Sequence, residues 1–153
     1  MDDLAIARVL HVLGVVHWIG GLAFVTLVVL PHARRRGAEG VALFEAVERR
    51  FSGQVRFSVL LVGASGFWMT WRMDAWRRFH DPASWWMGAM LALWLFFMLL
   101  LFVVEPLAEG RVAAAARRDP DAALTRLARM HGVLLLAAAA TLLGAVGGAH
   151  GLF

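Results

Sequence analysis

The chain contains no cysteine and no lysine, and only 17% of its residues are charged. Without cysteine there is no disulfide framework, no zinc–thiolate site, no iron–sulfur cluster and no covalently attached c-type haem. Without lysine there is no Schiff-base or lysine-nucleophile chemistry. Hydrophobic residues make up 61% of the 153 residues, whereas soluble domains are under half apolar and about a quarter charged. This composition excludes an ordinary water-soluble globule, and it excludes a disordered chain, which would be polar and poor in aromatic residues.

Four apolar stretches are each long enough to cross a bilayer as a helix, which takes about 20 residues. Their approximate bounds are 4–30, 54–72, 85–104 and 129–150. Each is expected to be a helix, because hydrocarbon offers no hydrogen-bond partners to an open backbone. The sequence therefore predicts an all-α integral membrane protein, a single transmembrane domain over residues 1–153 built as an antiparallel four-helix bundle. The lipid bilayer is its first partner.

The basic residues are all arginine, and their positions predict the orientation of the bundle. The connections after the first and third stretches carry or adjoin most of them: Arg34, Arg35, Arg36, Arg49, Arg50, Arg56, Arg111, Arg117, Arg118, Arg126 and Arg129. The opposite side has only Arg8, Arg72, Arg77 and Arg78. Basic residues stay cytoplasmic, so both termini are expected on the outer, periplasmic side of a bacterial inner membrane. The net charge of +4 is then a matter of topology, and no nucleic-acid partner is expected.

The two cytoplasmic connections, 34–52 and 107–128, mix apolar and charged residues at helical spacing. This pattern predicts amphipathic helices on the cytoplasmic membrane surface. Asp119, Pro120 and Asp121 mark the restart of a helix within the second connection. The connections are therefore interpreted as helix extensions and not as catalytic segments.

Histidine is the residue type most able to carry chemistry, since no nucleotide, phosphate or nucleophile motif is present. His11 and His17 lie inside the first stretch, while His131 and His150 lie toward the inner and outer ends of the fourth. Ionisable groups within a span are costly and usually face the bundle interior, a cavity or a cofactor. Four-helix bundles hold haem b between histidines of two helices. The four histidines are therefore candidate axial ligands of one or two haem b groups, and hydrogen bonding across helices is their alternative role.

The depth of each histidine in the membrane and its angular position on the helix limit which histidines can bind the same group. His17 is turned by about 120° from His11, so the two are not expected to share one small metal site. Because the first and last stretches run antiparallel, His11 with His150 is the expected outer pair, and His80 could replace His150. His131 pairs with His17 only if the fourth helix lies deeper than its sequence bounds suggest.

Two further sets of residues are candidates for binding. Arg56, near the inner end of the second stretch, suits a haem propionate, although snorkelling to the interface also explains such an arginine. Met69, Met73 and His80 gather on the outer side and are soft ligands compatible with Cu(I). Methionine in apolar spans is more often packing material, so copper is the alternative metal.

Residues 10–22 read Leu-His-Val-Leu-Gly-Val-Val-His-Trp-Ile-Gly-Gly-Leu. This segment resembles the opening helix of the copper resistance D domain family and of the related HemJ-type protoporphyrinogen oxidases. In this resemblance His11 falls on the family histidine regarded as a haem ligand, and Trp18 falls on the family tryptophan. The chain departs from the HemJ type in having no lysine and in carrying Arg129-Met130-His131-Gly132 where that type has Asn-Glu-x-Pro. The resemblance implies haem binding, and the departures weaken porphyrinogen oxidation.

The function expected from these residues is that of a haem b-binding membrane redox protein. It would pass electrons between a membrane quinol or a small oxidant and a partner on the outer face. The alternatives are a copper transport or tolerance protein, a HemJ-type protoporphyrinogen IX oxidase, and an assembly subunit without a cofactor. A quinone and a second copy of the chain are the further partners considered.

Overall fold

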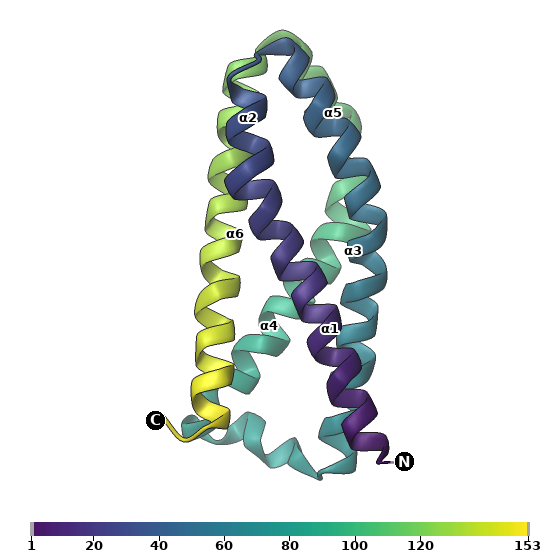
Figure 1. Cartoon of the computed structure of the whole chain (residues 1–153), viewed down its shortest axis with the longest axis vertical. Helices are drawn as coiled ribbons and strands as arrows, with labels where there is room; N and C mark the ends of the chain where they lie inside the picture. The colour runs from purple at the N-terminus through teal and green to yellow at the C-terminus, as the bar shows by residue number, and fades with distance from the viewer. Residues whose placement is uncertain (1, 153) are drawn as a thin grey trace.

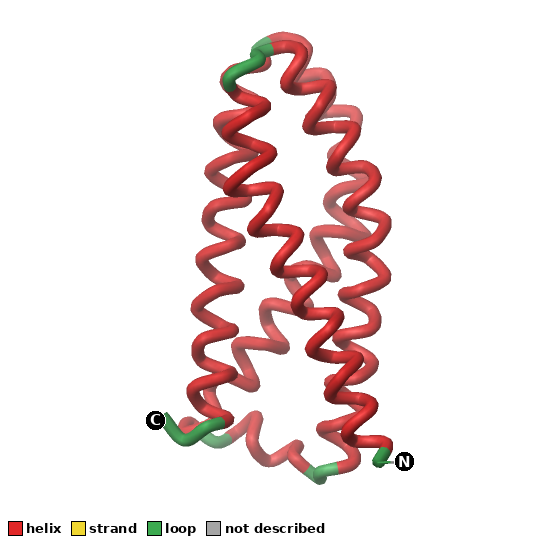
Figure 2. Tube along the Cα trace, viewed as in Figure 1, coloured by secondary structure: helices red, strands yellow, loops and turns green. Residues whose placement is uncertain are grey.

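The computed structural model describes residues 2–152, and within them it contains helices and no strands. The α-helices, in chain order, are α1 (Asp3–Phe24), α2 (Leu30–Arg34), α3 (Ala38–Arg72), α4 (Trp85–Leu99), α5 (Glu105–Arg118) and α6 (Pro120–Ala149). Short helical turns complete the chain: Val25–Val29, Ala75–His80, Pro82–Ser84 and Leu100–Val104. Loops are confined to the two ends of the molecule, as the green segments of Figure 2 show. The all-α prediction is confirmed.

These elements form long helical rods. In chain order the rods are α1 with α2, then α3, then α4 with α5, and last α6. They run side by side, with both termini at the same end of the molecule (Figure 1). Within residues 2–152, three helical segments are long and apolar enough to cross a membrane: Asp3–Arg34, Pro82–Arg118 and Pro120–Ala149. The chain is therefore a multi-pass membrane protein. Helix α3, although 35 residues long, is not among them.

The connections 34–52 and 107–128 are largely helical continuations of the long rods. Residues 38–52 form the first part of α3 without interruption, and α5 continues the rod begun by α4. No proline lies between residues 38 and 72 to end a helix there. At this end of the molecule the chain turns at residues 35–37 and at Asp119, whose side chain accepts a hydrogen bond from the Ala122 amide at 3.0 Å and so caps α6. The amphipathic segments therefore lengthen the bundle toward its tip.

In the first and third rods, a wide π-helical turn directly precedes the helical turn that contains a proline. Val25–Val29 precedes Pro31, and Leu100–Val104 precedes Pro106. Proline lacks an amide hydrogen and its ring clashes with the carbonyl one turn earlier. A π turn shifts that hydrogen-bonding register by one residue, so the Leu30 amide bonds to the Val25 carbonyl. The rods thus continue as helices where the sequence predicts an end at Glu105-Pro106.

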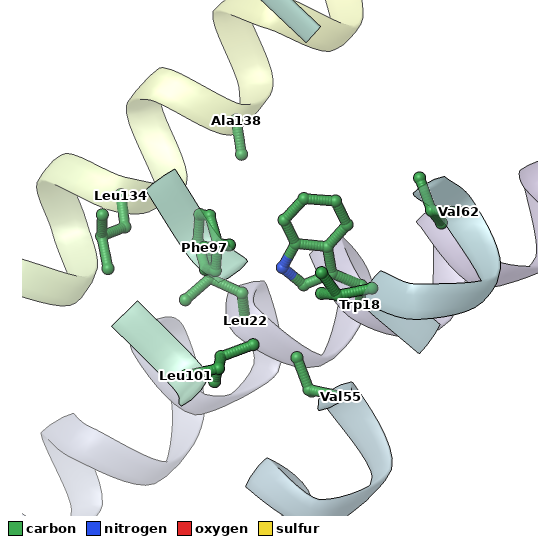
Figure 3. Packing of buried hydrophobic residues seen from close by; sticks show 9 residues of the cluster. Trp18, Leu22, Val55, Val62, Phe97, Leu101, Leu134 and Ala138 are labelled. Atoms are coloured by element: carbon green, nitrogen blue, oxygen red, sulfur yellow. The ribbon is translucent and has the colours of Figure 1, made fainter. Parts of the chain in front are cut away.

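The centre of the bundle is filled by an apolar cluster drawn from α1, α3, α4, α6 and the turn after α4 (Figure 3). Trp18 is only 3% exposed and meets the Phe97 ring edge-on, with ring centroids 4.8 Å apart. The indole N–H of Trp18 has no hydrogen-bond acceptor, and its nitrogen lies on the side of Phe97 (Figure 3). The middle of the bundle is therefore a packed apolar layer.

Tryptophans of α4 occupy spaces that glycines leave open. A Cβ at Gly144 would come within 2.6 Å of the Trp85 ring, and one at Gly148 would collide with Trp86. Trp94 lies over Gly63 and donates its indole N–H to the Val59 carbonyl at 2.8 Å. At these glycines of α3 and α6, the aromatic rings of α4 pack directly against the helix backbone.

Candidate functional site

The polar residues of the first rod gather where α1 packs along α3. The two helices pack closely at Gly14, where an added Cβ would stand 2.7 Å from a methyl of Val62. His11 and His17 lie three residues to either side of this point, so both imidazoles reach α3. Their partners there are serines two helical turns apart, Ser65 and Ser58. The two histidines of the first rod thus occupy separate positions along one helix–helix interface.

The hydrogen bonds of His11 fix which of its nitrogens carries the proton. Nδ1 lies 3.0 Å from the Val62 carbonyl oxygen and 3.2 Å from Ser65 Oγ. A carbonyl oxygen only accepts, so Nδ1 donates. The Ser65 hydroxyl donates to the Leu61 carbonyl at 2.6 Å, which turns its lone pairs toward the imidazole. The half-buried His11 therefore presents an unprotonated Nε2, the arrangement that metal-ligating histidines use.

His17 differs because both of its ring nitrogens are engaged by α3. Nδ1 lies 2.8 Å from Ser58 Oγ, and Nε2 lies 3.3 Å from Gln54 Oε1. Its ring also lies 6.0 Å from that of Phe51, measured between centroids. The amide oxygen accepts from Nε2, and the serine hydroxyl can donate to Nδ1. His17 thus makes a polar link between α1 and α3, as histidines within membranes do across helices.

His131 and His150 bond to their own helix and leave Nε2 free. Nδ1 of His131 donates to the Leu127 carbonyl at 3.0 Å, and Nδ1 of His150 donates to the Val146 carbonyl at 2.8 Å. His131 is 8% exposed and meets the Phe44 ring edge-on, whereas His150 is exposed at the end of α6. In both histidines, as in His11, Nδ1 is therefore the donor.

The structure associates the inner histidines more closely than the outer ones. His17 contacts Phe51 and His131 contacts Phe44, and these phenylalanines stand seven residues apart on one face of α3. At the end of the molecule where both termini lie, the first and last rods diverge (Figure 1), and the hydrogen bonds of His11 lead to α3. Across residues 2–152 no group of three or more histidine, aspartate or glutamate side chains is placed to hold a metal ion.

Arg56 is held by a partner that the sequence analysis did not identify. Its Nη2 lies 3.5 Å from a carboxylate oxygen of Glu105, and its Nε donates to the Leu101 carbonyl at 3.2 Å. The Ser52 hydroxyl, 2.6 and 2.8 Å from the two Glu105 oxygens, donates to the same carboxylate. The sequence signal for this ion pair was the placement of opposite charges, Arg56 and Glu105, at the inner ends of two apolar stretches. Arg56 retains further N–H donors for a second anion.

The candidate copper ligands lie at the outer end of α3 and beyond it. The amide of Met73 bonds to the carbonyl of Met69 at 3.0 Å, so these residues stand one turn apart. Met73 is 47% exposed, and His80 is exposed at the end of the turn Ala75–His80. Asp74, in the left-handed region at φ 47°, separates that turn from α3. The three residues thus belong to two different segments.

Glu48, on the charged half of α3, gives the folded chain a pH dependence. Burial raises the pKa of its carboxyl from 4.5 to about 7, and the nearby Glu105 and Glu45 add to the rise. The folded state then holds a proton that the unfolded state releases between these pH values, so stability falls as pH rises from 4.5 through 7. The upper limit of the loss is about 3 kcal/mol. Thermal unfolding in detergent between pH 4.5 and 8 measures it.

In the Glu48→Gln variant this decline should be largely absent. Glu39→Gln is the matched control, because Glu39 is exposed on the same helix and should keep the wild-type profile. A Glu48→Gln profile that still declines as steeply as wild type would contradict the assignment.

The chemical capacity of the α1–α3 interface lies in neutral imidazole donors within an apolar bundle. His11 donates through Nδ1, Trp18 is buried two turns further along α1, and Arg56 is paired with Glu105. Such groups can ligate a metal or donate and accept protons. Comparison of the chain with known protein families, with curated proteins and with solved structures finds no match.

Proposed function

We propose that the chain is a haem b-binding redox protein of the bacterial inner membrane, with His11 as an axial ligand. The observation that carries this proposal is the 3.0 Å hydrogen bond from His11 Nδ1 to the Val62 carbonyl. A backbone carbonyl on Nδ1 fixes the ring orientation and raises the basicity of Nε2. Neutral imidazole nitrogen is the common protein ligand of haem iron.

The proposed bundle has four spans, with α3 crossing the membrane over residues 54–72. Two features support this arrangement. Both termini lie at one end of the molecule (Figure 1), which an even number of crossings requires. The arginine-rich connections lie at the other end, which is cytoplasmic by the positive-inside rule. The termini are then periplasmic.

A second axial nitrogen beside His11 would come from His150. His131 would serve only a separate inner haem, because it contacts Phe44, about 27 Å along α3 from the Val62 that His11 contacts. Both hold their Nδ1 proton on a backbone carbonyl, so each keeps the lone pair on Nε2 that a ligand needs. His17 has both nitrogens in hydrogen bonds and is assigned to the link between α1 and α3. Arg56, with donors left beyond those given to Leu101 and Glu105, is the candidate partner of a propionate.

Bound haem would supply reversible one-electron chemistry. The chain itself would surround the group with apolar side chains, since the buried residues around Trp18 and Phe97 are apolar. Low polarity around the site raises the influence of each nearby charge. A membrane quinol and an outer-face acceptor are the proposed electron partners.

An absorption spectrum of the purified chain tests this function. After haem-replete expression, the oxidised protein should show a Soret band that shifts and sharpens on addition of dithionite. A colourless protein of normal helical content would overturn the haem proposal. Retention of Cu(I) by that colourless sample, lost on replacing Met69 and Met73, would support the copper alternative instead.

A further inference from the structure

A groove between α5 and α6 opens at the cytoplasmic tip of the bundle, with a volume of about 620 Å³. Its walls carry three arginines, Arg111 and Arg118 from α5 and Arg126 from α6. Its floor is apolar, made by alanines together with Val112 and Leu127. Small side chains in the floor leave the space open, while the arginines line it with positive charge.

The helical hairpin sets the arginines at defined levels. The chain turns at Asp119, so residues equally far before and after it face each other across the groove. Arg111 and Arg126 are eight and seven residues from the turn and therefore stand at nearly the same level, about 10 Å from the tip at 1.5 Å per residue. Arg118 lies two turns from Arg111 on the same side of α5.

The positive charge of this groove is not neutralised within the part of the chain described here. The ion pairs found in residues 2–152 are Arg56 with Glu105 and Arg72 with Asp3, and none involves the three groove arginines. One carboxylate, that of Asp119, lies in the wall. It accepts the Ala122 amide hydrogen as the cap of α6. Three guanidinium groups facing one capping carboxylate leave a net positive groove.

The membrane end of the groove lies next to the headgroup layer, where long arginine side chains can extend back toward it. The apolar run of the third rod ends at Glu105, so Arg111 stands about 9 Å beyond it. The polar layer on each side of a bilayer is about 5–8 Å thick. On the membrane side of the groove the helices expose apolar side chains, Leu107 by 76% and Val133 by 66%. Basic groups with lipophilic surface directly beneath them suit an amphiphile with an anionic head.

We propose that this groove binds an anionic phospholipid of the cytoplasmic leaflet. The headgroup phosphate lies between Arg111 and Arg126, with Arg118 toward the tip, and the acyl chains follow the exposed apolar surface past Leu107. Guanidinium groups suit this role because their planar forks match phosphate oxygens. Basic pockets on the cytoplasmic side of helical membrane proteins recognise lipid headgroups in this way.

Lipid retention tests the site. The purified full-length protein in a neutral detergent is titrated with phosphatidylglycerol or phosphatidylcholine, and bound lipids are counted by native mass spectrometry. Wild type should retain phosphatidylglycerol preferentially. The preference should fall by about fivefold for each groove arginine removed, so Arg111→Gln with Arg126→Gln should nearly abolish it. Arg118→Gln alone should lower it less.

The matched control is Arg117→Gln with Arg129→Gln, which removes the same charge from the same two helices outside the groove lining. This variant should keep the wild-type preference. Equal retention of both lipids by wild type would overturn the proposal, and so would equal losses in the two double variants. Displacement of phosphatidylglycerol by inorganic phosphate at similar concentration would identify a free-anion site and overturn the lipid assignment. Unchanged thermal midpoints establish that each variant remains folded.

Discussion

A chain with His11 replaced by alanine is expected to purify as a helical membrane protein that has lost its Soret band. The substitution removes Nε2, the proposed iron ligand, together with the Nδ1 contact to Val62. Loss of a supporting hydrogen bond alone costs about 10–100-fold in metal affinity, and loss of the ligand itself should cost more. The haem-to-protein ratio, measured from the reduced spectrum of the purified variant, gives the result.

Controls separate ligation from folding at this position. Ser65→Ala removes the weaker 3.2 Å contact but leaves the carbonyl bond of His11 intact, so it should keep the band. His80→Ala, in the exposed outer turn, should keep it as well. Added imidazole should restore colour to the His11→Ala chain, because it can occupy the vacated space and bind iron. Wild-type haem content in His11→Ala would remove His11 from the site.

The histidine positions could be predicted from the sequence, but their partners could not. Hydropathy places His11 and His17 inside a span, yet it does not say which neighbouring helix they face. The antiparallel pairing of the first and last stretches led to His11 with His150, whereas the hydrogen bonds of His11 go to α3. That choice depends on the close approach at Gly14, which is a property of the packed pair of helices.

The sequence predicts that these segments are helical, but it does not predict where the helices end. The apolar runs predict helices wherever lipid must be crossed. Their ends are harder to predict, because Glu105 with Pro106 is typical of a helix boundary but is bridged by the wide turn Leu100–Val104. Residues 38–52 likewise continue into the apolar half of α3. At Glu105-Pro106, packing of neighbouring rods favours a continuous helix over the local signal to stop, whereas residues 38–72 contain no proline that would end α3.

Gly40→Ala is expected to destabilise the tip of the bundle strongly. An alanine Cβ would collide with the carbonyl group of Ala33, and it would stand 2.9 Å from the Ala33 Cα. These are backbone atoms, so no side-chain rotation relieves the collision and α2 must move away from α3. That movement opens the cluster around Leu30 and Phe44, which are 0% and 2% exposed. Overpacking of this kind costs about 1–3 kcal/mol.

Thermal unfolding in detergent measures the effect, with Gly53→Ala as the matched control in the same helix. Nothing lies within 4 Å of a Cβ at Gly53, so alanine there should be neutral or should stabilise α3 by up to about 1 kcal/mol through its helix propensity. At about 2–4 °C per kcal/mol for a chain of this size, the midpoint of Gly40→Ala should fall by several degrees. Equal midpoints for the two variants would mean that α2 and α3 do not meet at Gly40. The same glycine-to-alanine change is expected to shift the unfolding midpoint in opposite directions at two positions of α3 that are 13 residues apart. The difference arises from the neighbours, because a Cβ at Gly40 meets the backbone of α2 and a Cβ at Gly53 meets nothing within 4 Å.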